Sequence, residues 1–157
     1  MKPEYFLSVV VGRNIDLLRE KPGRLASAVN ILLTLDAFVG ILHAALVAAG
    51  VSVPDKDDEF RDVLAAQNED YRIVRDAAFA IKHGQLTGRK SRIVTNSKQM
   101  AIYGAVFEEA VFQDGVFEMG AARIEVDSTS VDVVEVAERV ITFLYEILEQ
   151  TSGGQRQ

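Results

Sequence analysis

The sequence feature that most constrains the fold is a long apolar stretch between Arg24 and Ala49. Its residues alternate in steps of three and four and so form one helical stripe, and other faces carry Ile31, Phe38, Ile41 and Ala45. The stripe consists of Leu25, Val29, Leu32, Leu35, Val39, Leu42 and Leu46. A helix that is apolar nearly all round must lie at the centre of a bundle or form half of a subunit interface. Asn30, Asp36 and His43 argue against a membrane span, because a charge at mid-bilayer costs several kcal/mol.

Three further helices are predicted from apolar spacing and end signals. The first runs from Pro3 to about Arg19 and uses Phe6, Val9, Val10, Leu17 and Leu18 for its apolar contacts. Another helix, which follows the apolar one, is expected to begin in the acidic run 55–59 and to continue without a break to Gly84. The last is expected to be capped within 128–130, and its packing stripe consists of Val133, Ala137, Val140, Leu144 and Ile147.

Between Ile102 and Val126 the apolar period changes from that of a helix to short β-prone runs, two of which flank Asp114-Gly115. The sequence therefore predicts a mainly α fold, a four-helix up-down bundle with a small antiparallel β hairpin or meander inserted before the last helix. We expect one domain over residues 1–150, with the insertion at about 102–126, and a disordered tail at 151–157.

The charge of the chain is unevenly distributed. The net charge is −6 and the pI is about 4.9, which argues against a generic polyanion binder. Residues 77–107, however, contain five basic side chains and no Asp or Glu, and these are Lys82, Arg89, Lys90, Arg92 and Lys98. A local cationic patch on an acidic body is therefore expected. The absence of cysteine excludes disulfides and thiolate metal sites, and we expect no metal or other cofactor.

The segment from Arg75 to His83 carries the residues best suited to chemistry. If Val74 and Ala78 face the core, Asp76 and His83 share the opposite face, with Arg75 on its flank. Asp76 could then hold the imidazole, and Arg75 could present a fork of donors to a phosphate. Such a set can cleave a phosphodiester, because His moves a proton and Arg stabilises charge on the phosphate oxygens.

Arg75-Asp76, six residues and then His83 resemble the R-[N/D/H]-x(4–6)-H signature of the HEPN superfamily. The resemblance covers roughly residues 24–84 in pattern, and it implies a compact helical domain that is usually a homodimer. It also implies a metal-independent endoribonuclease, often a toxin or defence effector with a cognate protein partner. In that interpretation Arg75 and His83 are the catalytic pair, and Asp76 is the polar residue after the Arg.

Other interpretations of the same residues remain open. Arg75 and Asp76 can form ordinary helix-surface pairs, while Lys82 and His83 complement the negative end of the helix dipole. The basic residues Lys82, Arg89, Lys90 and Arg92 can bind RNA or nucleotide phosphates, or lie on a solvated loop. A non-catalytic dimeric interaction or nucleotide-binding module is therefore the alternative to a nuclease.

A second polar pair, Asp36 and His43, lies seven residues apart on one face of the apolar helix. We expect it to make polar contacts within an interface, with Arg75 as a partner for Asp36. No secretion signal is recognised at the N-terminus, which together with the absence of cysteine predicts a cytoplasmic protein with no membrane partner.

Overall fold

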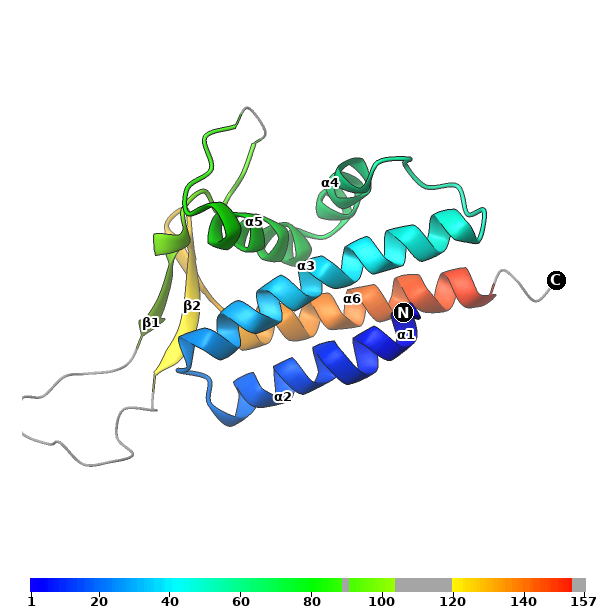
Figure 1. Ribbon diagram of the computed structural model, residues 1–157. Helices are drawn as coiled ribbons and strands as arrows, with labels where there is room; N and C mark the ends of the chain where they lie inside the picture. Colours follow the sequence, from blue (N-terminus) through cyan, green and yellow to red (C-terminus); the bar gives the residue numbers. More distant parts are fainter. Residues whose placement is uncertain (89–90, 104–119, 154–157) are drawn as a thin grey trace, which may run out of the picture.

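The computed structural model describes residues 1–88, 91–103 and 120–153, with side chains up to 150. In this part of the chain the fold is mainly helical and carries a small three-stranded antiparallel sheet at one end (Figure 1). The mainly α class with a small β element is therefore confirmed. The segments 104–119 and 154–157 lie outside the described residues, and they include the predicted turn at Asp114-Gly115.

The apolar helix predicted at the centre is α3, Leu25–Ala48, and it contacts α2, α4, α5 and α6. Leu32, Leu35, Val39 and Leu42 of its stripe are fully or almost fully buried. By length and composition it is the one helix among the described residues that could cross a membrane, yet half of its most apolar window is buried inside the protein. Burial by its own chain accounts for its composition.

The N-terminal helix is continuous but changes its winding. It begins as α1, Pro3–Tyr5, passes through the π-helical turn η1, Phe6–Val11, and continues as α2, Gly12–Glu20. A π-helical turn holds one residue more than an α-helical turn, so it shifts which side chains face the core. The buried face is consequently made by Leu7, Val11, Ile15 and Leu18. Of the predicted contacts, Leu18 is buried and Phe6 packs against the core, whereas Val9 is 47% exposed, so the predicted face is correct only in part.

The predicted helix from 55–59 to Gly84 is two helices, α4, Asp57–Gln67, and α5, Glu69–His83. They are separated by Asn68, whose backbone is extended and whose side chain accepts a hydrogen bond from the Tyr71 N–H at 2.8 Å. An N-cap of this kind restarts a helix because it satisfies a free backbone donor. The break changes the direction of the chain, and α4 and α5 diverge in Figure 1.

The sheet has the order β1-β2-β3, with β1 at Met100–Tyr103, β2 at Ala121–Val126 and β3 at Thr129–Asp132. The predicted N-caps at 128–130 are therefore wrong, because these residues form the β2–β3 turn and the start of β3. The last helix, α6, Val133–Gly153, is capped by Asp132, which accepts from Val134 N–H at 2.8 Å. Its predicted stripe is confirmed, since Val133, Ala137, Val140 and Leu144 are fully buried.

Candidate functional site

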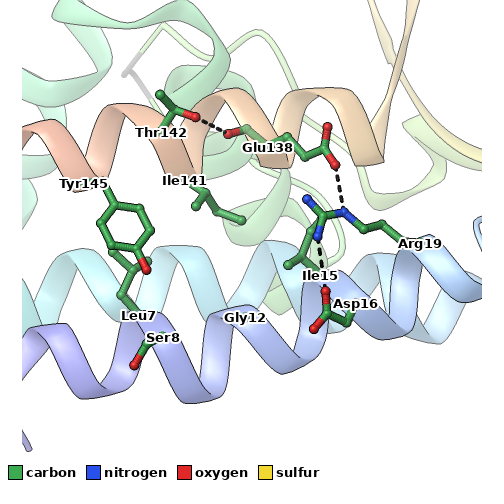
Figure 2. Close-up of a pocket in the computed structure, with 10 residues that line it drawn as sticks. All are labelled: Leu7, Ser8, Gly12, Ile15, Asp16, Arg19, Glu138, Ile141, Thr142 and Tyr145. Carbon is green, nitrogen blue, oxygen red and sulfur yellow. Dashed lines mark hydrogen bonds and ion pairs between the residues drawn. The ribbon is translucent and has the colours of Figure 1, made fainter.

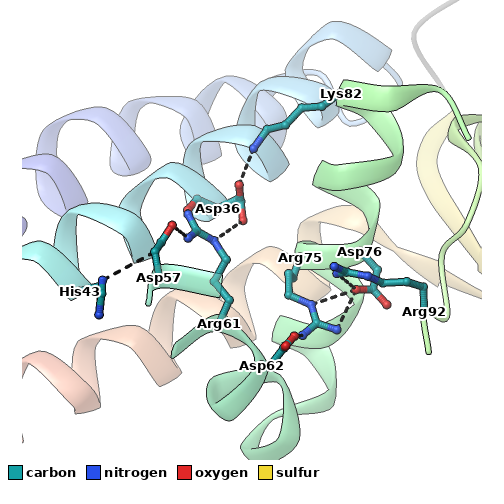
Figure 3. A network of polar contacts seen from close by, with 9 residues as sticks. All are labelled: Asp36, His43, Asp57, Arg61, Asp62, Arg75, Asp76, Lys82 and Arg92. Atoms are coloured by element: carbon teal, nitrogen blue, oxygen red, sulfur yellow. Dashed lines mark hydrogen bonds and ion pairs between the residues drawn. The ribbon is translucent and has the colours of Figure 1, made fainter. Parts of the chain in front are cut away.

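The end of α5 is fixed to the core by a network of buried charges, which falls into two clusters (Figure 3). One is centred on Asp36 of α3 and the other on Asp76 of α5, and these carboxylates are 2% and 0% exposed. Among the described residues, each cluster joins two acidic and two basic side chains. Buried ions of this kind persist only where partners replace the lost water.

The Asp36 cluster joins α3, α4 and α5. Arg61 of α4 donates from Nε to Asp36 Oδ1 at 3.0 Å and from Nη2 to the Asp36 carbonyl at 3.0 Å, and it also pairs with Asp57. Lys82 Nζ lies 2.5 Å from the other carboxylate oxygen of Asp36. Gly40 makes room for this arrangement, because a Cβ there would lie 3.1 Å from Arg61 Nη2.

The predicted partner of Asp36 was therefore wrong, since Arg61 and Lys82 occupy the position proposed for Arg75. Burial alone would lower the pKa of Arg61, but its bond to Asp57 and the charge of Asp36 raise it above the ordinary value. The guanidinium remains charged within the protein.

The other member of the predicted pair on α3, His43, lies at the edge of this cluster and not at a ligand site. Its Nε2 is 2.7 Å from the carbonyl of Pro54, and its ring stacks on Phe60 with centroids 5.1 Å apart. Its Nδ1 is 4.0 Å from Asp57 Oδ1. His43 thus holds the connection between α3 and α4, as a buried polar contact.

The Asp76 cluster joins α4 and α5 to the chain that follows α5. Arg75 donates from Nε to Asp76 Oδ1 at 2.9 Å and from Nη1 to Asp62 Oδ1 at 2.6 Å. Arg92 Nη1 reaches the same oxygen of Asp76 at 2.7 Å, and the Ile93 N–H donates to Asp76 Oδ2 at 2.9 Å. Both carboxylate oxygens of Asp76 are thus occupied.

These contacts change the expected orientation of the motif. Asp76 was placed on the outer face of α5 beside His83, yet it is fully buried, because the chain after α5 folds back over it. Arg75 is 5% exposed and is bound to Asp62 and Asp76. It lies eight residues from His83, or about 12 Å along the helix axis. In the single chain, the structure does not bring Arg75 and His83 together.

Residues 84–88 and 91–99, here called the strap, form this covering segment. Gly84 has a φ of 75° and reverses the chain after α5, a conformation that suits glycine. The two arms then pair through Leu86 N–H to the Thr95 carbonyl at 2.7 Å and Ser97 N–H to the Gly84 carbonyl at 2.9 Å. Arg89 and Lys90 of the predicted phosphate-binding set lie outside the described residues.

A pocket of about 390 Å³ lies between the end of α5 and the strap. His83 and Arg92 both line it, together with Gln85, Leu86, Thr87, Gly88 and Thr95. His83 is exposed and its ring centroid is 6.1 Å from that of Phe79. The Arg92 guanidinium lies 4.6 Å above the Phe79 ring, within cation–π range.

Arg92 was predicted only as one member of a basic loop, and its role within the Asp76 cluster was missed. Its pairing with a carboxylate 16 residues earlier depends on how the strap returns, which local spacing does not reveal. Lys82, another predicted phosphate ligand, is 43% exposed but is held by Asp36.

A second hollow of about 420 Å³ lies between the N-terminal helix and α6 (Figure 2). Arg19 crosses one end of it, bound to Asp16 at 3.1 Å and to Glu138 at 2.8 Å. Its other lining residues are Leu7, Ser8, Gly12, Ile15, Ile141, Thr142 and Tyr145. Because its cation is already paired with two carboxylates, this hollow offers less to an anionic ligand than the pocket at His83.

No metal-binding group of three or more His, Asp or Glu side chains occurs within the described part of the chain. The sequence matches no family model and no curated protein, and no solved structure matches the fold.

Proposed function

We propose that this protein binds RNA through its phosphate groups at the pocket between α5 and the strap. The observation that carries the proposal is that one pocket is lined by both an exposed imidazole, His83, and a guanidinium held by a buried carboxylate, Arg92. Arg92 donates to Asp76 from Nη1, while Nε and Nη2 have no acceptor among the described residues. A guanidinium fixed in this way offers a phosphate several donors at a small further loss of side-chain entropy.

The proposal assigns different roles to the two arginines. Arg75 is 5% exposed and has two carboxylate partners, so releasing it to a ligand would leave buried charges unpaired. Arg92 reaches the pocket without giving up its carboxylate. In this account Arg75 supports the site from within, and Arg92 and His83 contact the ligand.

Binding of a short fluorescent single-stranded RNA, followed by anisotropy at several salt concentrations, tests the proposal. Arg92→Ala should weaken binding and lower the slope of log K against log salt by about 1, because one phosphate contact is lost. Arg139→Ala is the matched control. Arg139 is a surface arginine paired with Asp70, which lies 13 residues before His83, or about 20 Å along α5. Equal effects of the two substitutions, or no binding by the wild type, would contradict the proposal.

Cleavage of the bound RNA is a second candidate function, favoured by the accessible imidazole of His83 in the same pocket. His83 would accept the proton of a ribose 2′-hydroxyl while that oxygen attacks phosphorus. The bond from phosphorus to the 5′-oxygen would break, and this oxygen would take up a proton from water, which gives a 2′,3′-cyclic phosphate and a 5′-hydroxyl. Cleavage that persists in EDTA and is lost in His83→Ala would support it. Binding without cleavage would leave the protein as a binding module.

The HEPN-like assignment is proposed on the same residues. It is supported by the motif at the end of α5 and by the packing of α3 against α2, α5 and α6, which suits a four-helix up-down bundle. With it we propose a cytoplasmic homodimer that acts with a cognate protein partner. The mass of the protein in solution, measured on the RNA-binding samples, tests the dimer.

A further inference from the structure

Asp76 is the one fully buried carboxylate that bonds to both α5 and the strap within the described residues. Its Oδ1 accepts from Arg75 and Arg92, and its Oδ2 accepts from the backbone N–H of Ile93. Arg92 and Ile93 are neighbours in the strap, so a single side chain fixes both the cation and the backbone that carries it.

We propose that Asp76 is a positioning residue, which sets Arg92 at the pocket and fixes the strap that forms the pocket wall. The expected effect on RNA affinity rests on the proposed function, whereas the anchoring of the strap by Asp76 can be measured without RNA. Asp76 does not touch the ligand in this account. It acts through Arg92, whose guanidinium is held between the carboxylate at 2.7 Å and the face of Phe79 at 4.6 Å.

The arrangement requires a carboxylate at this position, and an amide does not replace it. Asp76 receives N–H donors at both oxygens, whereas the asparagine side chain has one acceptor oxygen and one donor NH₂. If the amide oxygen faces the two arginines, its NH₂ meets the Ile93 N–H. If the oxygen faces Ile93, the NH₂ meets two cations. The first orientation costs less, because it keeps an acceptor on two guanidinium groups, so Asp76→Asn should leave the Ile93 N–H without an acceptor.

The second anchor of the strap is the Gln99 side chain, which reaches the Ile93 carbonyl at 3.4 Å but not the Ile93 N–H. The Gln99 side chain accepts from Thr95 N–H at 2.8 Å and Asn96 N–H at 3.0 Å, and it donates to the Glu125 carbonyl at 2.7 Å. This end remains attached when Asp76 is changed. We therefore expect a local loosening around Arg92 and Ile93, with the Gln99 end still in place.

The experiment is amide hydrogen exchange resolved by residue, together with RNA anisotropy on the same samples. In the wild type the Ile93 amide should be protected relative to the Ser91 amide. In Asp76→Asn its exchange should become about tenfold faster or more, since a charge-assisted hydrogen bond is lost. RNA affinity should fall as well, because the loosened strap no longer fixes Arg92 at the pocket.

Asp70→Asn is the matched control. Asp70 is also an acidic residue of α5, but it bonds to Arg139 of α6 at 2.8 Å and lies six residues before Asp76, or about 9 Å along the helix. Its substitution should leave Ile93 exchange and RNA affinity unchanged. Equal changes in the two variants would indicate a general loss of stability and would overturn the positioning role.

Arg92→Met distinguishes the contact made by Oδ1 of Asp76 from the contact made by Oδ2. It also provides a second test if Asp76→Asn does not fold. It removes the cation but leaves Oδ2 free to accept from Ile93. RNA affinity should therefore fall while the Ile93 amide stays protected. Loss of Ile93 protection in Arg92→Met, or an unprotected Ile93 amide in the wild type, would overturn the proposal. If Ile93 exchange responds as expected but the wild type binds no RNA, the proposed function fails and the anchoring of the strap by Asp76 stands.

Discussion

The two charge clusters of this protein are each built on a buried carboxylate but are placed differently. Each is centred on a carboxylate that is at most 2% exposed. An arginine bonds to that carboxylate in each cluster, Arg61 of α4 in the first and Arg92 of the strap in the second. The Asp36 cluster joins three helices, α3, α4 and α5, and its arginine is buried. The Asp76 cluster extends through Arg92 to a surface pocket. Under the proposed function, the first cluster holds helices together, whereas the second also places a cation at the pocket.

The largest effect on folding is expected at Asp36. Asp36→Ala leaves the buried Arg61 with only the half-exposed Asp57 as a partner, and breaking a buried pair from one side costs about 3–5 kcal/mol of unfolding free energy. Asp70→Ala removes an exposed pair with Arg139 and should cost about 0–1 kcal/mol. Urea unfolding followed by circular dichroism measures both. Similar small losses in the two variants would show that the Asp36 cluster does not hold the helices.

An intermediate effect is expected at two glycines with similar φ angles. Gly84 and Gly50 have φ values of 75° and 71°, and a Cβ at either would meet no atom within 4 Å. Alanine at each should therefore cost about 1–2 kcal/mol through backbone strain alone. Only Gly84→Ala should also weaken RNA binding, because Gly84 begins the strap. Weakened RNA binding in Gly50→Ala would contradict the placement of the RNA site at the strap.

The smallest effect is expected at Tyr71, which the charges of both clusters influence. Its hydroxyl is buried and has no hydrogen-bond partner in the described structure. Tyr71→Phe should therefore leave the unfolding free energy unchanged or raise it by up to about 1 kcal/mol. A loss of more than about 1 kcal/mol would mean that the hydroxyl does form a bond.

The same residue gives a pH dependence with a defined sign. Burial, followed by the negative charge of Asp36, raises the pKa of Tyr71 above its ordinary value of 10.0. The folded state thus keeps the proton that the unfolded chain releases above pH 10, so stability falls as the pH rises past this value. Urea unfolding at pH 9 and pH 11 should show a smaller loss for Tyr71→Phe than for the wild type. An equal loss in both proteins would show that Tyr71 does not cause the fall in stability at high pH.

The helices were predictable where apolar spacing is long and regular. The stripes of α3 and α6 were found because each repeats over several turns, and the glycine that ends α5 was read directly. The break at Asn68 was missed because the apolar spacing continues across it. Asn68 followed by Glu69 and Asp70 is nevertheless the composition of a helix start, and this signal could have placed the boundary.

The candidate site was predictable in its position but not in its arrangement. Residue types identified Arg75, Asp76 and His83, and helical geometry was used to place them on one outer face. That step failed because the spacing within α5 does not reveal that the chain after the helix buries Asp76. The strap covers that face and brings Arg92 to Asp76. Contacts between a helix and the chain that returns over it depend on the whole path of the loop, which residue spacing does not specify.

The most direct test of the central claim uses the two histidines of the chain, His43 and His83, as paired probes. Ring signals of both can be followed by NMR while a short single-stranded RNA is added to the wild-type protein. His83 lines the pocket, whereas His43 is 7% exposed and is held by Pro54. The account predicts that the His83 ring signal shifts in a saturable way while that of His43 stays in place. A stationary His83 signal in the presence of bound RNA would contradict it.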